Sequence, residues 1–512
     1  LAELLASLSL GIDLGFGQPM EHVLRQCRIA LRLGELVGLD EDSRATLYYT
    51  ALLINVGCHA DAYEQARWCG DDIALKAAKY DHEPGTIKEA AAMLRFLGSG
   101  NHPLHRVRVA FDFALSGHKE FDGMIARHAG LARAFGELLR LPGAVLEALS
   151  SSYERWDGRG WPGELSGDAI PYASRISQLA EFIEVAHRTG GIGAARAVAT
   201  RRSGKQFDPN LVSIFDADAE KVLHGIDEVD SWDAVIDAEP ALAVRLSPAE
   251  CDAALAAIAM FVDLKSPFTL GHSVAVAELA AGAGRRAGLP REDEQTLYRA
   301  GLVCGFGRLG VSNAIWDKRG PLTAGEWERV RLHPYLTERM LRQSAALAAL
   351  GRLAVQLRER LDGSGYPRGL SGAAISEPAR ILAAADAYQS MIEPRPHRPA
   401  MAAADAAREL RGEVRAGRLD GDAVDRVLDA AGHRVARRRD GPGGLTEREV
   451  EVLRLVARGL TTKEIAGKLV VAPKTVGNHI EHIYTKIGVS NRAAASLFAM
   501  QHGLLPEHAF PP

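Results

Sequence analysis

Four side chains in the second half of the chain are of types that bind metal ions. They are His272, Cys304, His333 and Asp386. Together they offer two imidazole nitrogens, a thiolate and a carboxylate, a set of donors that tetrahedral zinc accepts. The competing interpretation is a small buried cysteine beside two hydrogen-bonded histidines. Residue types alone do not bring these four side chains together; if the fold does, the two hypotheses for this half are no cofactor, or a single zinc ion.

One stretch of the chain occurs twice. The segment ERWDGRGWPGELSG at 154–167 returns as ERLDGSGYPRGLSG at 359–372. Glycines and a proline at matching offsets predict a loop with special backbone angles in each half. Arg175 and Arg380 follow the two copies, and we expect each arginine to tie its loop to a following helix. Such an internal repeat predicts two related domains in tandem.

Length and composition restrict the class of protein. The chain has 512 residues, of which 47% are hydrophobic and 25% charged, so it should form several globular domains. Its apolar runs are too short to cross a bilayer and its first residues lack a signal-peptide pattern, so we expect a cytoplasmic protein without membrane contact. The five cysteines lack CxxC spacing, as expected for reduced thiols. Because the net charge is -4, a nucleic-acid partner must meet a local basic patch.

Helical periodicity dominates the sequence, which predicts an all-α fold. An acidic stretch containing Pro240 and Pro248 indicates a linker, and a basic stretch rich in Gly and Pro near 440 indicates a tether. The expected order is a domain at 1–225, a linker at 226–250, a domain at 251–432, a tether at 433–444 and a final domain at 445–508.

The final domain carries helix-start signals at regular intervals. Thr446 and Thr461 each precede a glutamate by three positions, the spacing of a capping box. Pro473 suits the first turn of a third helix, and Ser490 is placed to cap a fourth. The short connection between the second and third helices is that of a helix-turn-helix, whose later helix enters the major groove. Residues 444–505 closely resemble the LuxR/NarL-type DNA-binding domain.

The third helix of this domain has an apolar and a polar face. The residues expected in the core recur at helical spacing: Val476, Ile480, Ile483 and Ile487. The residues expected to face double-stranded DNA are Lys474, Thr475, Asn478, His479, His482 and Lys486. An asparagine can form two hydrogen bonds with adenine, and lysines attract phosphates. Arginines between 434 and 439 are a second candidate for contact with the DNA backbone.

Residues 255–400 resemble an HD-GYP domain, the helical phosphohydrolase module associated with cyclic-di-GMP hydrolysis. The resemblance is carried by GHS around His272, HP at His333, ADAY around Asp386 and the loop at 359–372. It implies two or three metal ions that activate water and hold the phosphodiester, bound by clustered His and Asp side chains.

Several ligand positions of that family are replaced in this half. The adjacent His-Asp pair is Cys304-Gly305, and the double histidine is Leu357-Arg358. Arg308 stands where a lysine is expected after the pair. Glycine cannot replace a metal-bridging carboxylate, and an arginine adds positive charge where cations would bind. We therefore expect no catalytic residues and no enzyme activity.

The first half departs further from the family. His22 fits the first histidine, Asn55 falls at the aspartate of the pair, and Tyr153 falls at the double histidine. Glu181 stands where the late aspartate belongs, and His128 is a candidate for the middle histidine at a shorter spacing. Too few ligands remain there for a metal centre.

These patterns favour a DNA-binding transcriptional regulator whose two degenerate HD-GYP-like halves form a sensory or dimerisation platform. The alternative is a metal-dependent cyclic-dinucleotide phosphodiesterase with an attached DNA-binding domain. A third version keeps a nucleotide-like ligand bound without hydrolysis, with Arg358 in the old pocket. The expected partners are double-stranded DNA, a second copy of the chain, and a small-molecule or nucleotide effector.

Overall fold

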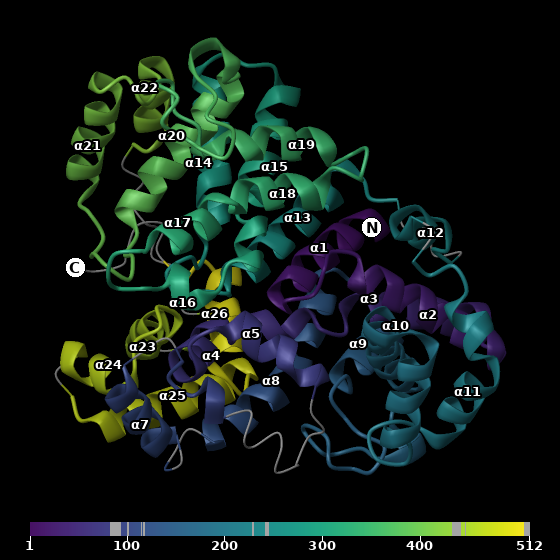
Figure 1. Cartoon of the computed structure of the whole chain (residues 1–512). Helices are drawn as coiled ribbons and strands as arrows, with labels where there is room; N and C mark the ends of the chain where they lie inside the picture. Colours follow the sequence, from purple (N-terminus) through teal and green to yellow (C-terminus); the bar gives the residue numbers. More distant parts are fainter. Residues whose placement is uncertain are drawn as a thin grey trace. The chain divides into compact units, whose positions relative to one another are not determined.

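The chain folds into helices joined by loops (Figure 1). The computed structural model describes residues 1–81, 94–99, 102–113, 115, 118–227, 230–240, 245–432, 442–445, 447–469 and 471–505. Within these residues no strand is present, which confirms the predicted all-α class. None of the helices in this described part is long and apolar enough to cross a membrane. The arginines between 434 and 439, predicted to contact DNA, lie outside the described residues.

The chain divides into two compact units, Leu1–Ala254 and Leu255–Pro512. In the first unit α2, α3 and α10 pack against one another. Asp40 caps α3 and Asp208 caps α11, each through its side-chain oxygen. The helices of this unit are α1 (Ala2–Gly15), α2 (His22–Leu36), α3 (Glu41–Leu53), α4 (Ala62–Cys69), α5 (Asp72–Ala77), α7 (Pro103–Asp112), α8 (His118–Leu138), α9 (Gly143–Ser150), α10 (Tyr172–Arg202), α11 (Pro209–Leu223) and α12 (Ser231–Asp237), with 3-10 helices η1 (Val56–His59), η2 (Ala78–Tyr80) and η4 (Gly167–Ala169).

The stretch 226–250, predicted as a linker, contains α12 and the start of α13. Trp232 and Val235 of α12 are buried. The stretch predicted as a linker thus includes a helix with packed apolar side chains.

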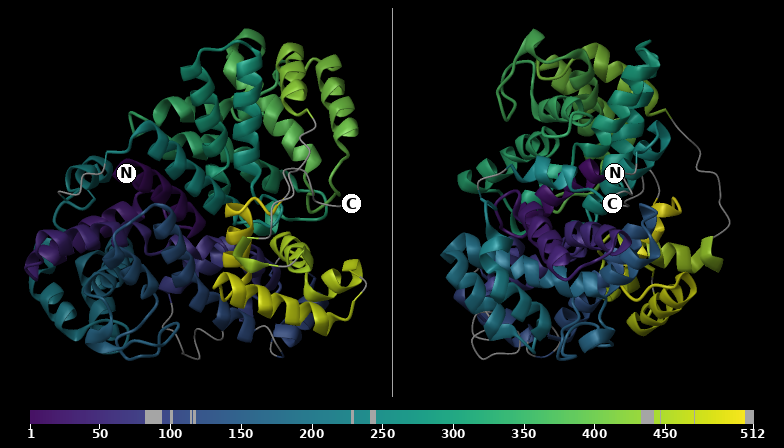
Figure 2. Two further views of the ribbon diagram at one scale, coloured as in Figure 1. Left: turned by 180° about the vertical axis from the view of Figure 1, so that it is seen from behind. Right: turned by 90° about the vertical axis from the view of Figure 1, so that its right-hand side faces the viewer.

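In the second unit α14 packs against α15, α20 and α22. Figure 2 shows from two further sides that this unit, too, is built of helices joined by loops. The helices between 248 and 430 are α13 (Pro248–Asp263), α14 (His272–Arg286), α15 (Arg291–Val303), α16 (Asn313–Trp316), α17 (Ala324–Arg331), α18 (His333–Leu341), α19 (Ala348–Ala354), α20 (Glu377–Ile392), α21 (Ala403–Arg415) and α22 (Gly421–Ala430), with 3-10 helices η5 (Phe306–Gly310), η6 (Val355–Arg358) and η7 (Gly372–Ala374).

The chain ends in four short helices, as predicted: α23 (Glu447–Ala457), α24 (Thr462–Leu469), α25 (Pro473–Ile487) and α26 (Arg492–Gln501), preceded by the 3-10 helix η8 (Pro442–Gly444). The capping box at Thr461 is confirmed, because its backbone N–H donates to Glu464 at 2.8 Å and its hydroxyl accepts from the N–H of Glu464 at 3.3 Å. Thr446 lies outside the described residues. The prediction that Ser490 caps the fourth helix is wrong: Asn491 accepts from the N–H of Ala494 at 2.7 Å.

Candidate functional site

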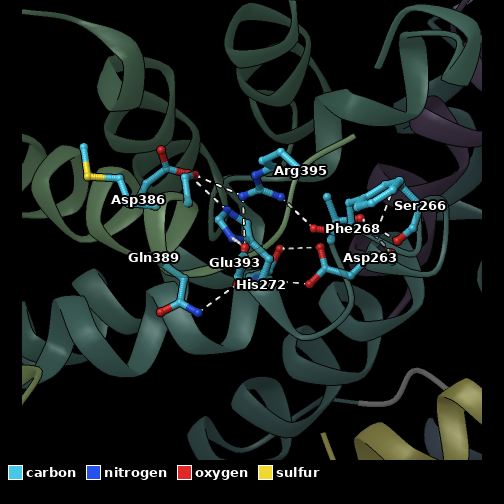
Figure 3. Close-up of polar contacts among 12 residues, drawn as sticks. Asp263, Ser266, Phe268, His272, Asp386, Gln389, Glu393 and Arg395 are labelled. Carbon is cyan, nitrogen blue, oxygen red and sulfur yellow. Dashed lines mark hydrogen bonds and ion pairs between the residues drawn. The ribbon is translucent and has the colours of Figure 1, made fainter. Parts of the chain in front are cut away.

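His272 lies at the start of α14, inside a buried polar network (Figure 3). Gly271 before it adopts a left-handed conformation with φ of 74°, which turns the chain into the helix. The Nδ1 atom of His272 lies 2.7 Å from Glu393, and its Nε2 atom lies 3.2 Å from Asp386. Arg395 forms an ion pair with Glu393 at 2.9 Å. The histidine therefore joins two buried carboxylates that belong to α20 or follow it directly.

Asp386 is a buried carboxylate of this network that faces two guanidinium groups. Its carboxylate lies 3.0 Å from the guanidinium of Arg358 and 3.9 Å from that of Arg308. Burial alone would raise the pKa of Asp386, but Arg358 and the hydrogen bond from His272 hold that pKa well below its usual range. The aspartate is therefore ionised, and its counter-charge comes from arginine side chains.

His333 and Cys304 lie close to the arginines of this network but are uncharged. Burial and the positive charges of Arg358 and Arg308 lower the pKa of His333 to about 3. Its Nδ1 atom is 2.7 Å from the carbonyl oxygen of Val330, and its buried Nε2 atom has no partner among the described residues. Burial raises the pKa of the Cys304 thiol to about 12, so this sulfur stays protonated.

His333 stands where it does because a glycine allows α18 to approach. A Cβ atom at Gly307 would lie 1.9 Å from the carbonyl oxygen of His333. In the first unit a Cβ atom at Gly57 would lie 2.1 Å from the carbonyl oxygen of His128. Since a side chain at either glycine would clash with the backbone, the same close approach occurs twice. The packing of His128 against Gly57 thus resembles that of His333 against Gly307.

The four predicted metal-ligand positions do not form a metal site. The part of the chain that the structure describes brings no three His, Cys, Asp or Glu side chains together as ligands. The carboxylate of Asp386 is already paired with Arg358 and His272, so its oxygens are not free to bind a cation. The two or three metal ions implied by the HD-GYP resemblance do not fit this donor set either. A guanidinium would compete with them for the same oxygens.

The first unit has a comparable buried carboxylate, Glu181 on α10. Its Oε1 atom accepts hydrogen bonds from Asn55 and Tyr80, each at 2.8 Å, and forms an ion pair with Lys79 at 2.5 Å. Burial would raise the pKa of Glu181, but the charge of Lys79 lowers it. Here, too, a basic side chain of the protein neutralises the carboxylate.

A second polar cluster in the first unit joins a thiol and an imidazole. The Cys58 sulfur lies 3.5 Å from Nδ1 of His128 and 2.6 Å from the hydroxyl of Tyr153. Nε2 of His128 forms an ion pair with Asp61 at 2.8 Å. Burial opposes ionisation of the thiol, but His128 lowers the pKa of Cys58, while that of His128 rises to about 9. Cys58 and Arg308 each follow the tightly packed glycine of their unit.

A buried glutamate holds each repeated loop. Oε1 of Glu154 accepts from the backbone N–H groups of 163, 164 and 165 at 3.1, 2.8 and 3.2 Å. Glu359 accepts from those of Arg368 and Leu370 at 2.7 and 2.8 Å. A carboxylate that bonds several backbone N–H groups fixes the loop's conformation. The predicted special loops are therefore present in both units.

The arginine after each loop ties it to a later helix, as predicted. Arg175 lies 2.8 Å from Asp208, the capping residue of α11. Arg380 lies 3.1 Å from Asp420, the capping residue of α22, and donates to the carbonyl oxygen of Gly372 at the end of its loop.

A cavity of about 580 Å³ in the second unit is lined by Arg308 and Arg358, the arginines that face Asp386. Its walls combine cationic and aromatic side chains, among them Arg308, Arg358, Arg395, Trp316, Trp327 and Tyr366. Arginine suits phosphate oxygens, and aromatic rings suit nucleobase faces. The chemistry of the walls thus matches an anionic, base-containing ligand.

The predicted DNA-facing residues divide by exposure. Lys474, Thr475, Asn478, His482 and Lys486 are exposed on α25, and His479 is half-buried. Lys486 forms an ion pair with Glu449 at 2.6 Å, so it also braces its own domain. Of the predicted core residues, Val476 and Ile483 are buried, whereas Ile480 and Ile487 are half-buried.

Two parts of the second unit match known protein families. Residues 256–423 match the HD domain family, and residues 444–499 match the bacterial regulatory proteins of the luxR family. A 3'3'-cGAMP-specific phosphodiesterase 3 of Vibrio cholerae is 34% identical over 408 residues, which cover 78% of this chain and 88% of that protein. A second relative, 3'3'-cGAMP-specific phosphodiesterase 1 of the same organism, is 39% identical over 171 residues, or 33% of this chain and 40% of that protein.

Among solved structures, a cyclic GMP-AMP specific phosphodiesterase of V. cholerae superposes with a TM-score of 0.58 at 29% identity. The match covers 85% of this chain and 98% of that one. The molecule is thus an HD-domain protein with a LuxR-type DNA-binding domain at its carboxyl-terminal end. The chain belongs to the HD-domain family that contains the 3'3'-cGAMP-specific phosphodiesterases.

These relatives correct one prediction. The expectation that the chain is not an enzyme is contradicted, because proteins 34% and 39% identical to it are named phosphodiesterases. The expectation rested on the replaced pair Cys304-Gly305 and on Leu357-Arg358, that is, on single positions compared with a family pattern. The similarity to the first of these relatives extends along 78% of the chain, so it rests on many more positions than the replaced ones.

Proposed function

We propose that this chain is a DNA-binding regulator whose HD domain recognises a 3'3'-linked cyclic dinucleotide, the class of molecule named for its relatives. The observation that carries the proposal is the cavity of about 580 Å³ lined by Arg308 and Arg358. Its volume lies in the range of small-ligand sites, and its walls carry guanidinium groups next to aromatic rings. Two phosphodiesters and two bases in one compact ligand call for that combination.

Individual wall residues suit the two parts of such a ligand. Arg308 is 5% exposed, yet its Nε and Nη1 atoms have no hydrogen-bond partner among the described residues. Unpaired buried donors are costly, and a phosphate oxygen would satisfy them. Trp327 is 44% exposed on the same wall, so its ring can stack on a base.

Hydrolysis of the bound phosphodiester is the second candidate function, favoured by the identity to named phosphodiesterases along 88% of one of them. In that reaction water adds to phosphorus and a P–O bond breaks, which converts the cyclic ligand into a linear dinucleotide. Arg358 and Arg308 can stabilise the charge that develops on the phosphoryl oxygens. Uncharged His333 presents an acceptor nitrogen at the cavity wall.

The first unit extends this proposal to a tandem arrangement. Glu154, Glu181 and His128 repeat the loop anchor, the buried carboxylate and the close approach of the HD domain. We propose the domain limits 1–225 and 251–432 on this basis, with the first unit as a platform for sensing and for dimerisation.

At the DNA end we propose that Lys474, Thr475, Asn478, His479 and His482 contact the duplex from α25, with Lys486 at the helix end. Readers of this size commonly bind paired half-sites as dimers. Two copies of the chain would then meet one stretch of DNA, and ligand binding would change how they are held.

Titration calorimetry of the full chain with 3'3'-cyclic GMP-AMP tests the proposal, with product analysis by chromatography. We expect binding in the micromolar range, weakened about tenfold by Trp327→Ala because a stacking contact is lost. Tyr335→Ala is the matched control, since Tyr335 is a similarly exposed aromatic, 39% against 44%, that does not line the cavity. Absence of binding, or equal weakening by both variants, would refute the assignment of the cavity. A linear product would establish the second candidate.

A further inference from the structure

Each unit buries an ionised carboxylate that a metal ion would ordinarily neutralise in the HD-GYP family. The side chain of Asp386 is 1% exposed and that of Glu181 is 5% exposed. A buried charge without a partner is strongly destabilising, so each must have a counter-charge.

In the HD domain that counter-charge is a guanidinium. Arg358 pairs with Asp386 at 3.0 Å, and Arg308 stands at 3.9 Å. The side chain of Arg358 is 20% exposed and lines the cavity, so the arginine that neutralises Asp386 also faces the ligand space.

In the first unit the counter-charge comes from a different part of the chain. Lys79 lies in η2, which follows α5 in the first unit. Arg358, in contrast, directly precedes the repeated loop of the second unit. It pairs with Glu181 at 2.5 Å and also donates to Asn55 at 3.2 Å. Two unrelated segments thus place a cation against the equivalent carboxylate.

We infer that basic side chains take the place of the metal ions in both units, and that in the HD domain Arg358 and Arg308 bind the phosphodiester of the ligand directly. This inference rests on the proposed function for the identity of the ligand. It names the recognition chemistry: an oxyanion held by two guanidinium groups without a bridging metal.

Unsatisfied donors support this assignment independently of the ion pairs. Nε of Arg358, and Nε and Nη1 of Arg308, are buried without hydrogen-bond partners among the described residues. Both arginines line the cavity. Because arginine carries a permanent charge and a planar set of donors, these groups are suited to phosphate oxygens.

The test compares binding of 3'3'-cyclic GMP-AMP to the full chain in EDTA and in Mn²⁺. We expect equal affinity in both buffers and a loss of about tenfold or more for Arg358→Gln, since a hydrogen bond to a charged group is removed. Arg358→Lys should recover part of the affinity, because lysine keeps the positive charge but lacks the planar pair of N–H donors of a guanidinium. Arg368→Gln is the matched control: Arg368 pairs with Glu338 at the surface and does not line the cavity.

Binding that requires Mn²⁺, or an Arg358→Gln variant that binds as tightly as the original chain, would overturn the inference. If the chain binds no cyclic GMP-AMP in either buffer, the proposed function is refuted. A titration with the metal alone then tests whether arginines have replaced the metal ions. Mn²⁺ titrated into chelator-treated protein should produce no heat of specific binding. Stoichiometric metal in that experiment, or in the purified chain, would show that arginine has not replaced it.

Discussion

The geometry of the Arg358–Asp386 ion pair allows its contribution to the free energy of unfolding to be predicted. In Arg358→Gln the buried carboxylate keeps His272 at 3.2 Å and Arg308 at 3.9 Å, but loses its nearest positive charge at 3.0 Å. Breaking a buried ion pair costs about 3–5 kcal/mol. Because Arg358 is 20% exposed and two partners remain, we expect a coupling energy of about 2–3 kcal/mol between Arg358 and Asp386.

A double-mutant cycle measures this energy. Arg358→Gln, Asp386→Asn and the double variant are unfolded in urea, and hydrogen exchange reports the stability of the second unit. The control cycle uses Arg380→Gln and Asp420→Asn, a pair 3.1 Å apart with side chains 27% and 21% exposed. Its coupling should stay below about 1 kcal/mol. If the two cycles gave the same coupling, the reasoning that burial makes the Arg358–Asp386 pair special would be refuted.

Three further predictions follow. Asn478→Ala should weaken DNA binding by about 1–3 kcal/mol and relax the sequence preference at one base pair. Lys474→Ala should weaken binding to all sequences alike and reduce the slope of log affinity against log salt concentration by about one. Fluorescence anisotropy on permuted operators at several salt concentrations separates the two effects, and an equal loss for every operator in Asn478→Ala would count against base reading. The pKa of His333, lowered to about 3 in the folded chain against about 6.5 unfolded, means that the unfolded state binds the proton first as pH falls. Stability should therefore decline by about 2 kcal/mol between pH 7 and pH 5 through this residue, and His333→Asn should abolish that part of the decline in denaturant titrations at the two pH values. Glu359→Ala should cost about 1–2 kcal/mol by leaving part-buried N–H groups of the loop without their acceptor, and Glu154→Ala should do the same in the first unit. Faster amide exchange confined to each loop's own unit is the expected signature, and unchanged exchange would exclude the anchoring role.

Local motifs were predictable from the sequence because their geometry depends on neighbouring residues. The repeated loops were predicted from their glycines and proline alone, and α25 from its proline and apolar spacing. Ser490 was a poor prediction for the same reason in reverse: Asn491, one position later, is an equally good cap, and local pattern does not separate the two.

Partners across helices were not predictable. Lys79 meets Glu181 and Glu393 meets His272 only after helices far apart in the sequence have packed. In the first unit His22 pairs instead with Glu184, one turn earlier on the equivalent helix than a residue matching Glu393 would lie. Nothing in the spacing of either segment distinguishes these two arrangements.

The glutamates that hold the repeated loops, Glu359 and Glu154, also affect which mutations these loops tolerate. Glu359 and Glu154 hold their loops through backbone N–H groups, and these hydrogen bonds do not depend on which side chain stands at the loop tip. That tip is Tyr366 in one copy and Trp161 in the other, and Tyr366 lines the cavity. Each loop is therefore a permissive position for mutation: ligand preference can drift, or be engineered, by exchanging one aromatic residue while the surrounding backbone keeps its form.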